Sequence, residues 1–122
     1  MKRVIVHNIN HPQMPPLEAG FCSSFLCRLR GLTFRWAINP QEGLLLVQGR
    51  ESRLDAAIHM LGVFTDLAVT WINTSGEVVD VRLARRWRPA YVPKRPARYI
   101  LETNPTRFND FKIGDHVSFE EL

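Results

Sequence analysis

Residues 82–98 form a segment rich in arginine and aromatic residues, and this part of the sequence is suited to binding an anion. The segment reads RLARRWRPAYVPKRPAR, so it contains no acidic residue and seven of the sixteen Lys and Arg residues of the chain. Guanidinium groups pair bidentately with phosphates and carboxylates, and aromatic rings stack on bases or sugars. We therefore predict a surface for a polyanion such as nucleic acid. Its ligand-binding residues would be Arg85, Arg86, Trp87, Arg88, Tyr91 and Arg98.

The same segment also allows a purely structural interpretation. Trp87 and Tyr91 could anchor a long loop on the domain while the arginines point into solvent. Pro89, Pro93 and Pro96 favour a loop that is held in this way. The sequence leaves both interpretations open.

His59 and Asp66 are the candidates for catalysis. A histidine titrates near neutral pH and can act as a general base or a metal ligand, and Asp55 and Asp66 lie nearby in the sequence. The alternative is a partly buried histidine that bonds to the main chain. The chain has no nucleophile elbow, Gly-rich phosphate loop or paired-carboxylate motif, so its motifs indicate no enzyme class.

The remaining histidines and the cysteines do not predict a metal site. His7 and His11 have metal-ligand spacing only on a helix, and Pro12 argues against a helix there. Cys22 and Cys27 lack the redox C-x-x-C spacing, and two thiols cannot complete a structural zinc site. We expect both cysteines to be buried and reduced, and we expect no metal and no cofactor.

The first third of the chain predicts a strand, a loop and a helix. Residues 2–7 contain a β-branched run typical of a strand, and three prolines with Gly20 predict a loop over residues 11–20. Apolar residues then recur with helical spacing, and Gly31 would cap the helix. These apolar residues are Phe21, Cys22, Phe25, Leu26 and Leu29.

The middle of the chain predicts buried strands and one hairpin. Residues 44–47 form an apolar run suited to a strand buried on both faces, and residues 66–73 suit a central strand. A turn with Gly76 at positive φ then leads to a strand with one wetter face that carries Asp80 and Arg82. Residues 50–60 fit either a helix or a strand.

The last part of the chain predicts a strand, a helical turn and a final strand. Residues 98–102 resume the strand pattern, and Asn104-Pro105 reads as a helix N-cap followed by the first helical position. A last short strand should end at Phe119. Six or seven short strands with one or two short helices make a mainly β domain, and closure into a small barrel would remove exposed edges.

An ordered set of motifs resembles the domain of unknown function 192 family, a set of small prokaryotic proteins. The motifs are Arg30 to Arg35 (RGLTFR), Glu42 to Leu45 (EGLL), Ile58 to Gly62 (IHMLG), Leu67 to Asn73 with Gly76, Ala97 to Glu102 (ARYILE) and Gly114-Asp115. The resemblance covers about Phe25 to Phe119. It implies a compact β-rich, barrel-like fold and no established activity, and it favours a strand over residues 50–60.

The chain departs from that family at the start of the central strand. Relatives there carry proline, an apolar residue and then aspartate, whereas this chain has Asp66, Leu67 and Ala68. The usual acid is therefore absent, and no catalytic role passes to Asp66 from the resemblance.

Size, composition and charge set further bounds. A chain of 122 residues with 45% hydrophobic and 23% charged residues is typical of one globular domain. We expect that domain to span residues 1–122, with a strand and Pro-rich loop in 1–20 and the family-like core in 21–122. No apolar run is long enough for a membrane span or a signal peptide, so we expect a cytoplasmic location.

Three functional hypotheses remain. The first is a non-catalytic binding module that engages an anionic partner through residues 82–98, as the net charge of +4 and its clustering suggest. The second is an enzyme of unassigned class with a pocket near His59 and Asp66. The third is a structural domain that docks another protein through apolar residues such as Trp36 and Phe64. The sequence does not indicate the oligomeric state.

Overall fold

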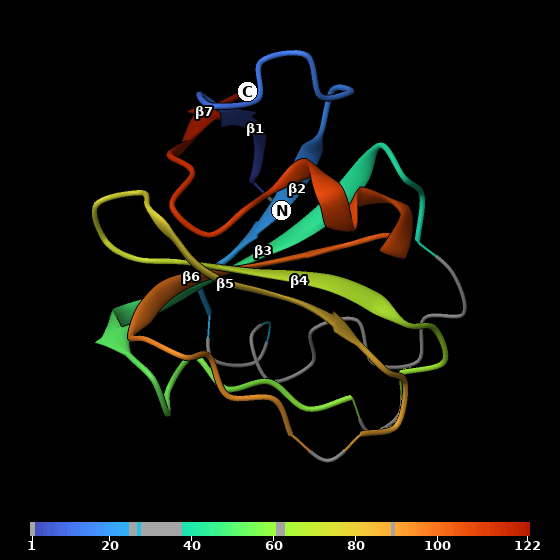
Figure 1. Cartoon of the computed structure of the whole chain (residues 1–122), viewed down its shortest axis with the longest axis vertical. Helices are drawn as coiled ribbons and strands as arrows, with labels where there is room; N and C mark the ends of the chain where they lie inside the picture. The colour runs from blue at the N-terminus through green and yellow to red at the C-terminus, as the bar shows by residue number, and fades with distance from the viewer. Residues whose placement is uncertain (1, 25–26, 28–37, 61–62, 89) are drawn as a thin grey trace.

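Seven strands form one sheet that curls into a half-barrel (Figure 1). The computed structural model describes residues 2–24, 27, 38–60, 63–88 and 90–122. In sheet order the strands are β5 (Val78–Ala84), β4 (Leu67–Ile72), β6 (Ala97–Thr103), β3 (Glu42–Ser52), β2 (Glu18–Cys22), β1 (Arg3–Asn8) and β7 (Val117–Glu121). All neighbours are antiparallel except β2 and β3. The predicted mainly β, barrel-like fold is confirmed.

The central strands are buried because apolar clusters cover both faces of the sheet. All six residues of β4 are buried between β5 and β6, as predicted for a central strand. Leu67, Val69 and Trp71 face one cluster, whereas Ile72 faces the other. Residues 44–47 of β3 are likewise buried on both faces.

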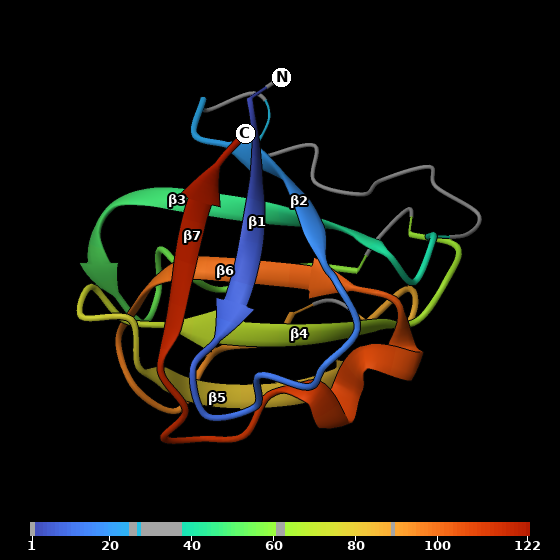
Figure 2. The ribbon, with the colours of Figure 1, turned by 90° about the horizontal axis from the view of Figure 1, so that it is seen from above.

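The strand order leaves β5 and β7 at opposite edges, but the curl brings their starts together. The Val117 amide donates to the Gly76 carbonyl at 2.8 Å, and the Val78 amide donates to the Asp115 carbonyl at 2.8 Å. Gly76 has φ +90°, as the turn prediction required, and a Cβ there would lie 2.7 Å from the Val117 carbonyl oxygen. Figure 2 shows β1 and β7 crossing over the central strands, so this part of the sheet forms the curled wall.

A short 3₁₀ helix, η1 (Pro105–Asp110), follows β6 and begins where the sequence predicted. The Asn104 side chain accepts a hydrogen bond from the Thr106 amide at 2.9 Å and so caps the helix. In the described ranges no helix is both long enough and apolar enough to cross a bilayer.

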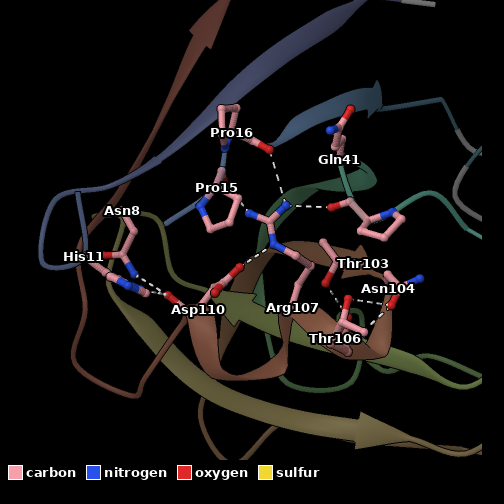
Figure 3. Close-up of polar contacts among 12 residues, drawn as sticks. Asn8, His11, Pro15, Pro16, Gln41, Thr103, Asn104, Thr106, Arg107 and Asp110 are labelled. Carbon is pink, nitrogen blue, oxygen red and sulfur yellow. Dashed lines mark hydrogen bonds and ion pairs between the residues drawn. The ribbon is translucent and has the colours of Figure 1, made fainter. Parts of the chain in front are cut away.

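Arg107 of η1 ties three segments together. Its guanidinium donates to the carbonyls of Pro15 (2.6 Å), Pro40 (2.6 Å) and Pro16 (3.3 Å) and pairs with the Asp110 carboxylate (Figure 3). The residue is only 4% exposed. This buried charge is stable because the chain supplies acceptors to it from several directions.

Two predictions in the first third of the chain are corrected by the structure. The helix expected from Phe21 is wrong at its start, because Phe21 and Cys22 belong to β2 and pair in parallel with Leu45 and Leu46. The loop expected over residues 11–20 ends early, because β2 begins at Glu18. Residues 25–26 and 28–31 of the predicted helix lie outside the described residues.

The cysteines are also not reduced thiols as predicted, because Cys22 and Cys27 form a disulfide. The ambiguous segment 50–60 is a strand only as far as Ser52, where β3 ends. Beyond a turn, Ala56, Ile58 and Met60 are buried in the core, and an isolated bridge joins Ile58 to Tyr91.

Candidate functional site

The basic segment, residues 82–98, begins in the last residues of β5, contacts Ile58, Met60 and Phe64, and re-enters the sheet as β6 (Figure 1). Ile58 and Tyr91 exchange two main-chain hydrogen bonds of 3.0 and 2.8 Å. The Tyr91 ring is half-buried against the apolar cluster, and its hydroxyl accepts a hydrogen bond from the Arg85 amide at 2.8 Å. Tyr91 therefore anchors the segment, in line with the structural alternative for this residue.

A tight turn at residues 85–88 presents the motif Arg-Arg-Trp-Arg. The four successive amides donate to the Tyr91 hydroxyl (2.8 Å), the Asp66 Oδ1 (2.9 Å), the Met60 carbonyl (2.8 Å) and the Arg85 carbonyl (3.3 Å), respectively. The Met60 amide returns a bond of 2.9 Å to the Arg88 carbonyl. The backbone of the turn is thus fixed by the protein rather than by solvent.

Trp87 lies at the tip of this turn in an unusual conformation. Its φ is +66°, and it is the one non-glycine residue with positive φ in the part of the chain that the structure describes. A left-handed conformation costs a residue with a Cβ about 1–2 kcal/mol. The ring contacts Phe64 edge-on at 5.4 Å between centroids, yet Trp87 is 50% exposed.

The cations of the segment differ in whether a carboxylate neutralises them. Three have a carboxylate within 4.0 Å, namely Arg82 with Asp80 (3.2 Å), Arg86 with Asp66 (3.9 Å) and Arg95 with Glu77 (4.0 Å). Arg85, Arg88 and Lys94 are exposed, and no carboxylate of the described ranges pairs with them. Arg98 donates to the Gln48 carbonyl at 3.2 Å and lies over the Tyr99 ring. Seven cations against three carboxylates leave a local excess of four positive charges.

Asp80 anchors the far end of the segment. We predicted this residue on the wetter face of β5, but it is 1% exposed. Its carboxylate accepts hydrogen bonds from the amides of Val81 (2.9 Å) and Lys94 (3.0 Å) and pairs with Arg82. The prediction is wrong because the returning loop covers the edge of the sheet and supplies donors to the buried acid.

Among the described residues, no hydrogen bond or ion pair joins the two candidate catalytic residues, His59 and Asp66. The His59 side chain is exposed, rather than partly buried with a main-chain partner. The Asp66 carboxylate holds the Arg86 amide and faces the Arg86 guanidinium. Asp66 therefore has a structural task in the turn.

Glu102 is a buried acid that the sequence reasoning did not single out. It lies on β6 between Leu44 and Val69 of the neighbouring strands and is 4% exposed. Its Oε1 has no hydrogen-bond partner among the described residues, and burial raises the pKa of the carboxyl to about 7. The available signal was an acid at the end of the apolar strand pattern RYILE.

Other polar groups lie apart from this segment. His7 Nε2 bonds to the Glu120 carboxylate at 2.8 Å, whereas His11 Nδ1 faces the Asp110 carbonyl at 3.2 Å. Across the described residues, no three His, Cys, Asp or Glu side chains gather as metal ligands. An open concavity of about 480 Å³ surrounds the disulfide, lined by Lys2, Phe21, Cys22, Ser23, Ser24 and Cys27.

The sequence is similar to a family of uncharacterised proteins. The family model for DUF192, described as "Uncharacterized ACR", matches residues 6–119. A UPF0127 protein of Thermococcus gammatolerans is 38% identical over 99 residues, which are 80% of this chain and 63% of that protein, so the chain spans less than two thirds of that relative. A UPF0127 protein of Pyrococcus furiosus is 40% identical over 86 residues, which are 70% of this chain and 71% of the relative.

Two solved structures share the fold. A protein of Sinorhizobium meliloti 1021, described as a candidate transcription regulator, aligns with a TM-score of 0.82 and 19% identity over 97% of this chain and 92% of its own. A protein of unknown function from Novosphingobium aromaticivorans aligns with a TM-score of 0.75 and 18% identity over 95% and 83%. At these identities the likeness concerns the fold alone.

Proposed function

The chain belongs to the DUF192 family, and from that premise we propose that it is a non-catalytic binding module for an anionic partner. The binding surface is the basic segment, residues 82–98. The observation that carries the proposal is a group of exposed cations, Arg85, Arg88 and Lys94, which no described carboxylate neutralises. An anionic partner would supply the missing charge.

The fixed backbone of the turn supports this proposal. Because four successive amides are already bonded within the protein, Arg85 and Arg88 start from a preorganised position. Binding then orders little more than the side chains, which reduces the entropic cost of association. Arg86 contributes less charge, since Asp66 lies 3.9 Å from its guanidinium.

The two alternative functions draw less support from the same contacts. An enzyme with His59 and Asp66 would need a free carboxylate, whereas Asp66 holds the turn. In the protein-docking alternative, the Phe64 ring is already in contact with Trp87. Its other residue, Trp36, lies outside the described residues.

Salt-dependent binding of a polyanion tests the proposal. The affinity for a single-stranded oligonucleotide should fall with salt, with a log–log slope of about −0.7 for each phosphate neutralised. An Arg85→Ser, Arg88→Ser, Lys94→Ser variant should lose about two units of that slope and elute earlier from heparin.

The matched control removes three positive charges elsewhere, at Lys2, Arg50 and Lys112. These side chains are exposed, and Lys2 and Arg50 pair with Glu121 and Asp55, outside the basic segment. This control should elute from heparin close to the wild-type protein. Equal elution of the two triple variants, or no binding of any polyanion at low ionic strength, would refute the proposal.

A further inference from the structure

We propose that Trp87 is a stacking site for an unpaired nucleobase, so that the anionic partner is a single-stranded nucleic acid. This inference rests on the proposed function and specifies its ligand. It depends on three observations at residues 85–88: the backbone conformation of Trp87, the support of its ring, and the unpaired cations on either side.

The conformation of Trp87 is the one that this turn normally gives to glycine. The Arg88 amide donates to the Arg85 carbonyl, which closes a four-residue turn, and positive φ occurs only at its third residue. That pattern matches a type II turn, whose third position favours Gly or Asn because other side chains are strained there. Burial does not offset the strain of Trp87, since half of the residue is exposed. Such strain is typical of ligand-binding positions.

The ring of Trp87 is held in place before any ligand arrives. The Phe64 ring contacts it at 5.4 Å with an interplanar angle of 75°, and the Trp87 amide bonds to the Met60 carbonyl. A braced but half-exposed indole can stack on a base without first being ordered, which favours affinity.

The flanking charges fit the backbone of a single strand. Arg85 and Arg88 lie on either side of Trp87 in the sequence, are exposed, and face no carboxylate of the described chain. A single strand offers phosphates next to an unstacked base, whereas a duplex covers both faces of each base with its neighbours. The cations alone would bind any polyanion, so selectivity for a nucleobase depends on the Trp87 ring.

The test compares two ligands that differ only in their bases. We would measure the affinity of the full chain for oligo(dT) and for an abasic oligodeoxynucleotide of equal length, and follow indole fluorescence. Base stacking should make oligo(dT) bind about five- to a hundredfold more tightly and should quench part of the emission. Trp87→Gly should lose this preference and the quenching, while it keeps the weaker affinity for the abasic strand.

Two properties of the Trp87 variants make the result easy to interpret. Gly suits a left-handed position, so Trp87→Gly should fold, which a thermal melt verifies. Trp87→Phe keeps an aromatic face and should retain most of the preference. Equal, salt-dependent binding of both oligomers by the wild-type chain would overturn the stacking site and leave the proposed function standing. A preference that persists in Trp87→Gly would also overturn it, and no binding of either oligomer would remove both proposals.

Discussion

Two arginine sites of this protein differ in what the chain does with the guanidinium. Arg107 is 4% exposed, and its donors reach Pro15, Pro16, Pro40 and Asp110. In the turn at residues 85–88, the chain instead satisfies the backbone amides and leaves the side chain of Arg88 exposed. An arginine whose donors are matched internally supports the fold, whereas one on a fixed backbone without partners is available to a ligand.

The prediction with the largest expected effect tests whether Arg107 and Arg88 differ in their contribution to stability. Arg107→Met removes a buried cation and leaves Asp110 and three carbonyls without their donor, so the free energy of unfolding should fall by about 3–5 kcal/mol. Arg88→Met, the matched control, should change it by less than about 0.5 kcal/mol. Urea unfolding of both variants measures the difference, and similar losses would mean that the two arginines are not distinct.

Glu102, a buried acid whose Oε1 finds no hydrogen-bond partner in the described part of the chain, sharpens the comparison from the other side. Burial raises the pKa of Glu102 from an ordinary 4.5 to about 7, because desolvation disfavours its carboxylate. Since the folded pKa is the higher one, Glu102 reduces stability as the pH rises from about 4.5 to 7, by up to about 3 kcal/mol above that window.

Glu102→Gln cannot ionise, so its stability should decline less over the same window. The measurement is the difference in unfolding free energy between about pH 5 and pH 8 for both proteins. The new amide also changes the unfolding free energy by an amount that does not depend on pH. The comparison therefore uses how the unfolding free energy of each protein changes with pH. Identical slopes would mean that Glu102 does not titrate in this window.

The smallest effect concerns the anchoring of the turn. Tyr91→Phe removes the acceptor of the Arg85 amide and should lower stability by about 1 kcal/mol. Tyr99→Phe is the control, since the Tyr99 ring packs on Phe119 and no described hydrogen bond uses its hydroxyl. Amide exchange at Arg85 should rise in the Tyr91 variant, and unchanged protection would show that the hydroxyl does not hold the turn.

The elements that the sequence predicted correctly have local signals. Apolar residues on both faces and Gly76 predict the hairpin of β4 and β5, and the positive φ of Gly76 is confirmed. The start of η1 follows from Asn104-Pro105, where the Asn104 side chain accepts a hydrogen bond from the Thr106 amide. Such signals need no knowledge of the rest of the chain.

The errors arise where distant partners decide the structure. Phe21 and Cys22 have helical spacing with the residues after them, but pairing with β3 makes them a strand. Their spacing did not predict the disulfide to Cys27 either. Asp80 was expected near solvent, and a loop fourteen residues later supplies the donor that buries it.

The candidate site was predictable in composition but not in detail. The sequence indicates the cluster of cations, because charge and aromatic content are local properties of residues 82–98. It does not indicate that Asp80, Asp66 and Glu77 neutralise three of them, since those contacts depend on the fold. The left-handed Trp87 and the buried Glu102 were missed for the same reason.

The pairing of β1 with β7 has a consequence for how the chain reaches its fold. The register joins Val4 to Glu121, so this ladder closes a loop of more than a hundred residues. On the ribosome, the strand containing Val4, Ile5 and Val6 can pair with β2 early, but its other edge stays unpaired until Val117–Glu121 has emerged. Nascent chains will therefore expose one β-branched strand edge until β7 is available, and chaperone contacts and aggregation should concentrate at that edge.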